Sequence, residues 1–92
     1  MSKISETAAD KPHKEIILEY YGAIRESRGI SRESVMTCAE DIDELFKELA
    51  SQNLIPYPRN ILSVAINDEF GSFSSVIKNG DKVVFMTPVA GG

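Results

Sequence analysis

The chain has 92 residues, of which 42% are hydrophobic and 26% charged, and its formal net charge is −4 at pH 7. This length allows one domain with a single hydrophobic core, and the composition argues against disorder throughout. The 10 Lys and Arg residues are scattered, which argues against nucleic-acid binding because such proteins need a concentrated basic face.

The first segment, residues 1–14, is predicted to be a flexible polar extension with the sequence MSKISETAADKPHK. It carries acidic residues and lacks the apolar core of a secretory signal. No apolar run in the chain reaches the length of a membrane span. The single cysteine, Cys38, excludes an internal disulfide framework and fits a reducing compartment. We therefore expect a cytoplasmic protein that does not bind membranes.

A domain covering residues 15–86 is predicted to begin with a strand in the segment EIILEYYG. This segment is rich in β-branched and aromatic residues and stops at Gly22. Apolar residues at both odd and even positions suggest a strand covered on both faces, or a central strand with one face kept for a partner. The next segment, AIRESRG, is interpreted as a short helical turn or a loop that ends at Gly29.

The clearest predicted element is a helix in the segment DIDELFKELASQ, preceded by a strand in SVMTCA. Asp41 is a candidate N-cap, and Glu44 follows three residues later, as in a capping box. Apolar residues recur at the spacing of one helix face: Ile42, Leu45, Phe46 and Leu49. This stripe predicts packing against the core rather than a binding site.

Three more strands are predicted after the two prolines of NLIPYPRN, which end any helix. They lie in ILSVAIN, in a short stretch from Phe70 to Phe73, and in KVVFM. Turns are expected at Asn67-Asp68 and at Gly80, which can adopt positive φ. The order of elements predicts an α+β fold with one sheet of about five strands packed on one main helix.

The last six residues, 87–92, have the sequence TPVAGG and are predicted to form an extended tail. At about 3.3 Å per residue this tail reaches roughly 20 Å, far enough to enter a pocket of another protein. Pro88 lowers the ordering cost of insertion. Gly91 and Gly92 have no side chains, so a narrow channel could bring the α-carboxylate to a reactive group. Because a carboxylate resists attack, a partner must first activate it, most simply as an acyl-adenylate made from ATP.

These segments together resemble the small subunit of molybdopterin synthase, over residues 15–92. The resemblance is carried by YYGAIRESRG, by the helix, by AIN with its turn, and by NGDKVVFMTPVAGG. It implies a ubiquitin-like β-grasp with a mixed sheet. It also implies that an activating enzyme adenylates Gly92 with ATP, that Gly92 becomes a thiocarboxylate, and that Gly91 is the slim residue beside it.

In the same family the sulfur passes to the pyranopterin precursor of the molybdenum cofactor inside the large subunit, in a heterotetramer of two small and two large subunits. The resemblance thus implies that the large subunit carries the catalytic residues and that this chain binds no cofactor itself. Thr87 departs from the family pattern, which often has a second proline there. Three alternatives stay open: a thiamin-type sulfur carrier, a ubiquitin-like modifier joined to lysine through Gly92, and an interaction domain with an inert tail.

Partner docking is predicted at the root of the tail. Strand parity groups Tyr21 with Ile17 and Met86 with Val84, and Phe70 begins the short strand beside them. An exposed cluster of Tyr21, Phe70 and Met86 would form a docking patch, and the resemblance places these residues in the family's contact region. The alternative is that they belong to a second core face. The remaining expected contacts are Arg25 at the rim and, in the tail, Thr87, Pro88, Val89 and Ala90.

The overall acidity predicts that partners present basic surfaces. Cys38 and His13 are the only soft or imidazole ligands in the chain, so no metal site is expected. Cys38 has no histidine beside it in the sequence and is interpreted as a small, buried strand residue without a reactive role.

Overall fold

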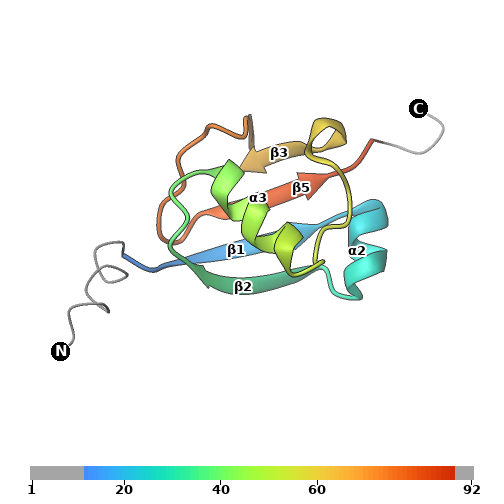
Figure 1. The fold of residues 1–92 in the computed structure, drawn as a ribbon, viewed down its shortest axis with the longest axis horizontal. Coiled ribbons are helices and arrows are strands. Elements are labelled where there is room, and N and C mark those ends of the chain that lie inside the picture. Colours follow the sequence, from blue (N-terminus) through green and yellow to red (C-terminus); the bar gives the residue numbers. More distant parts are fainter. Residues whose placement is uncertain (1–11, 89–92) are drawn as a thin grey trace.

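The computed structural model describes residues 12–88, which form a five-stranded sheet with helix α3 packed on one face (Figure 1). A second, shorter helix, α2, lies at one end of the sheet. The elements in chain order are β1 (Lys14–Tyr20), α2 (Gly22–Arg28), β2 (Arg32–Thr37), α3 (Ile42–Ser51), the 3-10 helix η1 (Arg59–Ile61), β3 (Ser63–Ile66), β4 (Glu69–Gly71) and β5 (Lys82–Met86). The predicted α+β class and mixed sheet are confirmed.

The sheet has the strand order β2-β1-β5-β3-β4, with β5 in the middle. Strands β1 and β5 are parallel, and all other neighbouring strands are antiparallel. The register pairs Leu18 with Val83 and Tyr20 with Phe85. Strands β1 and β5 therefore end on the same side of the sheet, where β1 continues into α2 and β5 continues into the tail.

The core lies between the sheet and α3. From the central strands it receives Ile16, Leu18, Tyr20, Val83 and Phe85, all of them fully buried. The predicted apolar stripe of α3 is buried against them. Three aromatic rings meet in this core: Phe46, Phe73 and Phe85 have centroids 5.6 to 6.4 Å apart. The hydrophobic effect of burying this one face is what holds the sheet and helix together.

The predicted N-cap of α3 is confirmed. The Asp41 carboxylate accepts a hydrogen bond from the Glu44 amide at 2.9 Å. The Glu44 carboxylate accepts one from the Glu40 amide at 2.9 Å, one residue earlier than a capping box would have it. The turn at Asn67-Asp68 is also confirmed, because both residues have positive φ, 52° and 74°, as a two-residue hairpin turn requires.

Several element ends differ from the sequence-based expectation. The open choice at AIRESRG resolves as a helix, α2, which ends at Gly29 with φ of 76°. Strand β4 stops at Gly71 instead of Phe73. The physical reason is that the Phe73 carbonyl accepts a hydrogen bond from the Asp43 amide, at 2.8 Å, which turns the chain toward the start of α3. Within residues 12–88, neither helix has the length and apolar character needed to cross a bilayer.

Candidate functional site

The root of the tail lies beside the first turn of α2. Thr87 and Pro88 follow directly after β5, and Gly22 follows Tyr21, which comes just after the last residue of β1. Gly22 has φ of 58°, and a Cβ atom built on it would lie 3.9 Å from the Thr87 hydroxyl. A left-handed glycine here lets the chain turn from β1 into α2 while the tail root passes alongside.

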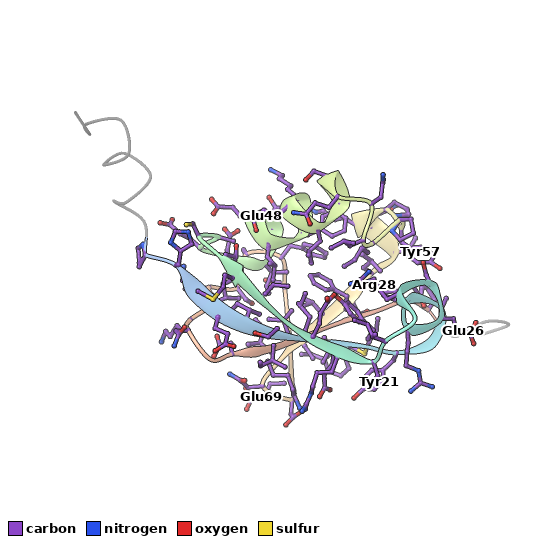
Figure 2. All side chains as sticks on the ribbon, turned by 90° about the horizontal axis from the view of Figure 1, so that it is seen from below. Tyr21, Glu26, Arg28, Glu48, Tyr57 and Glu69 are labelled. Carbon is purple, nitrogen blue, oxygen red and sulfur yellow. The ribbon has the colours of Figure 1, made fainter. Side chains whose placement is uncertain are left out.

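A groove with a volume of about 530 Å³ lies between α2 and the tail root. Its lining residues come from the end of β1, the first turns of α2, and the end of β5: Tyr21, Gly22, Ala23, Glu26, Met86, Thr87 and Pro88. Four residues of the predicted docking region therefore meet in one place. Figure 2 shows Tyr21 and Glu26 at this end of the molecule, with Tyr21 on the side of the sheet that faces away from α3.

The predicted cluster of Tyr21, Phe70 and Met86 is only partly assembled. Phe70 is 83% exposed and lies on the sheet face opposite α3, in the row Val84, Ala65, Phe70. It belongs to the outer strand β4, however, and β3 separates it from Met86 on β5. Phe70 therefore lines a separate hollow of about 420 Å³. It shares the face with Tyr21 and Met86 without joining them at the tail root.

Arg25 lies close to Tyr21, as expected for a rim residue. The two line a hollow of about 350 Å³ on the side of α2 that faces β2. Other charged groups nearby are already paired: Glu19 accepts a hydrogen bond from Arg32 at 2.5 Å and another from the Tyr21 hydroxyl at 3.0 Å. The bond from Arg32 is the main reason that the pKa of Glu19 is lowered, although burial opposes the shift.

A buried polar cluster that the sequence did not reveal fixes the position of α2. The hydroxyl of the fully buried Tyr20 donates a hydrogen bond to the Glu33 carboxylate at 2.5 Å. Arg28, near the end of α2, donates to the same carboxylate oxygen through Nε at 3.2 Å and Nη2 at 2.6 Å. The guanidinium also lies 5.6 Å from the centre of the Tyr20 ring. These contacts join α2 to β1 and β2, and so hold one wall of the groove in place.

The same cluster shifts the titration of its members. Burial and the hydrogen bond to Glu33 raise the pKa of Tyr20 from 10.0 to about 12. Burial alone would raise the pKa of Glu33, but hydrogen bonds from Tyr20 and Arg28 outweigh it and leave that pKa below its ordinary value. Both shifts follow from one arrangement, in which a neutral phenol and a cation donate hydrogen bonds to the same carboxylate.

Alkaline unfolding should report on Tyr20. The folded protein keeps the Tyr20 proton up to about pH 12, whereas the unfolded chain releases it near pH 10. The contribution to stability is therefore full below pH 10 and is lost as the pH rises toward 12. We expect Tyr20→Phe to lose less unfolding free energy than the unsubstituted protein between about pH 9 and about pH 11.5, by about 2 kcal/mol.

Urea titrations at the two pH values would measure this difference. Tyr57→Phe is a matched control, because it removes a phenol but keeps the Tyr20–Glu33 hydrogen bond. An equal alkaline loss in Tyr20→Phe and the unsubstituted protein would contradict the role given to the buried phenol.

Other predicted features have definite places. Cys38 was expected to be buried within a strand, but it is half-buried and follows β2, which ends at Thr37; His13 is exposed just before β1. The described part of the chain holds no group of three or more His, Cys, Asp or Glu residues arranged for a metal ion. Four predicted tail residues lie outside the described residues: Val89, Ala90, Gly91 and Gly92.

Comparison with known proteins agrees with this architecture. Small archaeal modifier protein 1 (SAMP1) from Haloferax volcanii superposes with a TM-score of 0.70 at 14% identity, over 85% of this chain and 99% of that chain. A putative molybdopterin converting factor subunit 1 from Pyrococcus furiosus gives 0.67 at 19% identity, over 83% and 99%. A complex of subunits 1 and 2 of molybdopterin-converting factor from Helicobacter pylori 26695 gives 0.60 at 24% identity, over 85% and 99%.

A search of curated protein sequences finds no match to the chain. A family model, described as the ThiS family, matches residues 18–92, which include every strand and helix after the start of β1 as well as the Gly-Gly segment. The chain therefore belongs to the ThiS family and has the ubiquitin-like β-grasp fold of sulfur carriers.

Proposed function

We propose that this protein is the sulfur-carrier subunit of a molybdopterin synthase. The observation that carries the proposal is the direction of β5. This strand is held between two neighbours in the centre of the sheet, and it ends beside α2, where the chain continues into Thr87 and Pro88 (Figure 1). The match to the ThiS family continues through these residues. A folded domain whose central strand leads directly into a segment that ends in two glycines suits delivery of a terminal group into a partner.

The chemistry proposed for Gly92 needs three steps. A carboxylate oxygen of Gly92 attacks the α-phosphate of ATP, which releases pyrophosphate and forms an acyl-adenylate. The terminal sulfur of a persulfide donor then displaces AMP to form an acyl disulfide, and a thiol reductant cleaves its S–S bond, so that one carboxylate oxygen is replaced by sulfur. The absence of side chains at Gly91 and Gly92 leaves the carbonyl uncrowded in the first two steps. An activating enzyme supplies the ATP site, and this chain supplies only the acyl group.

The sulfur acceptor in this proposal is the pyranopterin precursor, held in the large catalytic subunit. The Helicobacter pylori complex of molybdopterin-converting factor subunits 1 and 2 supports a two-subunit arrangement, because this chain shares the fold of one chain of that complex. The large subunit would carry the catalytic residues, and the complex would act in the cytoplasm as a heterotetramer. Tyr21 and Met86 would contact the partner beside the entering tail, with Arg25 and Phe70 farther out on the same side.

A second candidate is a protein modifier that is joined to lysine through Gly92. The likeness to small archaeal modifier protein 1 favours it, with a TM-score of 0.70. A thiamin-type sulfur carrier is the third, favoured by membership of the ThiS family. All three functions begin with the same adenylation and differ in the group that reacts with the activated glycine, or with its sulfur, afterwards.

Intact mass spectrometry of the full chain tests the proposal. The chain is incubated with ATP, the activating enzyme of the same organism, a cysteine-persulfide sulfur donor and a thiol reductant. We expect the mass to rise by the difference between one sulfur and one oxygen. Loss of sulfur from this form should accompany conversion of the pyranopterin precursor when the large subunit is added. An unchanged mass would contradict the carrier function, and stable conjugates of higher mass would favour the modifier.

A further inference from the structure

The groove between α2 and the tail root combines apolar walls with one carboxylate. Ala23, Met86 and Pro88 supply apolar surface, and Tyr21, which is 50% exposed, adds an aromatic ring. Glu26 is the only charged residue among the described residues that line the groove. Its side chain has no hydrogen bond or ion pair to any residue from 12 to 88. Figure 2 shows Glu26 projecting from α2 at the same end as Tyr21.

This combination selects one type of side chain. A purely apolar group in the groove would contact the apolar walls but leave the exposed Glu26 carboxylate without a partner. An acidic group would be repelled by the same carboxylate. A lysine or arginine matches both the apolar walls and the carboxylate, because its methylene stem can lie on apolar surface while its cationic end reaches a carboxylate. The Tyr21 ring would add a cation–π contact.

We propose that this groove binds a lysine or arginine side chain of the protein that receives the tail. The inference rests on the proposed function, since a protein that takes up residues 89–92 must pass along Thr87 and Pro88, which form one side of the groove. The net charge of −4 favours a basic partner surface. The contact would hold the tail root against α2 while the end of the chain lies in the partner.

The test uses the full chain, labelled with nitrogen-15, and a small probe instead of the partner. The protein is titrated with n-hexylammonium chloride and, separately, with n-hexanol, which has the same stem without the charge. We expect saturable amide shifts at Ala23, Glu26 and Met86, with about threefold tighter binding of the ammonium, as for an exposed ion pair. Glu26→Gln should bind both probes equally. Glu69→Gln is the matched control, since Glu69 is an exposed acid on β4, and it should keep the preference.

Equal binding of the two probes by the unsubstituted protein would overturn the inference. A preference for the ammonium that persists in Glu26→Gln would also overturn it, and so would shifts confined to other parts of the domain. The titration contains no ATP and no sulfur donor, so its outcome is separate from that of the mass measurement. A tail that accepts sulfur on a protein without ammonium preference would overturn this inference alone. Ammonium preference without sulfur loading would overturn the proposed function alone.

Discussion

Deletion of Gly92 is expected to abolish sulfur loading and leave the domain folded. The shortened chain still ends in a glycine carboxylate, that of Gly91, so the chemistry of the terminal group is preserved and only its position changes. The loss of one residue withdraws that group by about 3.3 Å. Misplacement of a reacting group by about 1 Å can already cost about 100-fold in rate. We therefore expect loading at least about 100-fold slower than in the full chain.

The rate of loading is measured by intact mass after timed incubation with ATP, the activating enzyme, the sulfur donor and the thiol reductant. Gly92→Ala is the matched control, because it keeps the reach of the tail and adds one methyl group; its loading should fall less than that of the deletion. Thermal unfolding should be the same in all three proteins, since β5 ends at Met86, well before the changed residue. Loading of the deletion at the rate of the full chain would rule out Gly92 as the acyl carrier.

Phe85→Ala is expected to remove a large part of the stability of the domain. Phe85 is fully buried in the central strand and packs against the rings of Phe46 and Phe73, with centroids 6.2 and 6.4 Å away. Truncation of a buried phenylalanine costs about 3–5 kcal/mol, because the transfer free energy is lost and a cavity remains. The total unfolding free energy of a native protein is only about 5–15 kcal/mol. This variant should therefore unfold at a much lower denaturant concentration than the unsubstituted protein.

Denaturant unfolding followed by circular dichroism would measure the change. Phe70→Ala makes the same substitution at a side chain that is 83% exposed, and its stability should change by no more than about 0.5 kcal/mol. A similar loss in both variants would show that the core is not centred on α3 and β5 in the way the structure describes. Because Phe70 is also a proposed contact, its variant separates docking from folding.

The sequence predicted those elements whose signals are local. The stripe and N-cap of α3 and the strand KVVFM lie where their patterns indicated. Other features depend on distant hydrogen bonds that have no local signal. Strand β4 ends early because the Phe73 carbonyl bonds to Asp43, and the cluster on Glu33 forms only once α2 and β2 lie next to β1.

The candidate site shows the same division. Strand parity pointed to Tyr21 and Met86, and parallel pairing of β1 with β5 brings them together. The order in which strands pair could not be predicted from single residues, so the sequence did not show that β3 would separate Phe70 from Met86. No sequence pattern singles out Glu26, because its place in the groove depends on how α2 lies beside β5. The role of Gly92 as acyl carrier stays a prediction, and it rests on the Gly-Gly sequence itself rather than on the arrangement of strands.

The central place of β5 has a mechanical consequence. Because β1 and β5 run parallel, the start of β1 and the end of β5 lie on opposite sides of the sheet. A force that pulls on the tail is therefore directed along β5, with hydrogen-bonded neighbours on both of its edges. Such a load shears both ladders at once instead of peeling them open bond by bond. If the proposed function holds, a partner would be able to take up the tail, or release it again, without unfolding the domain to which it is attached.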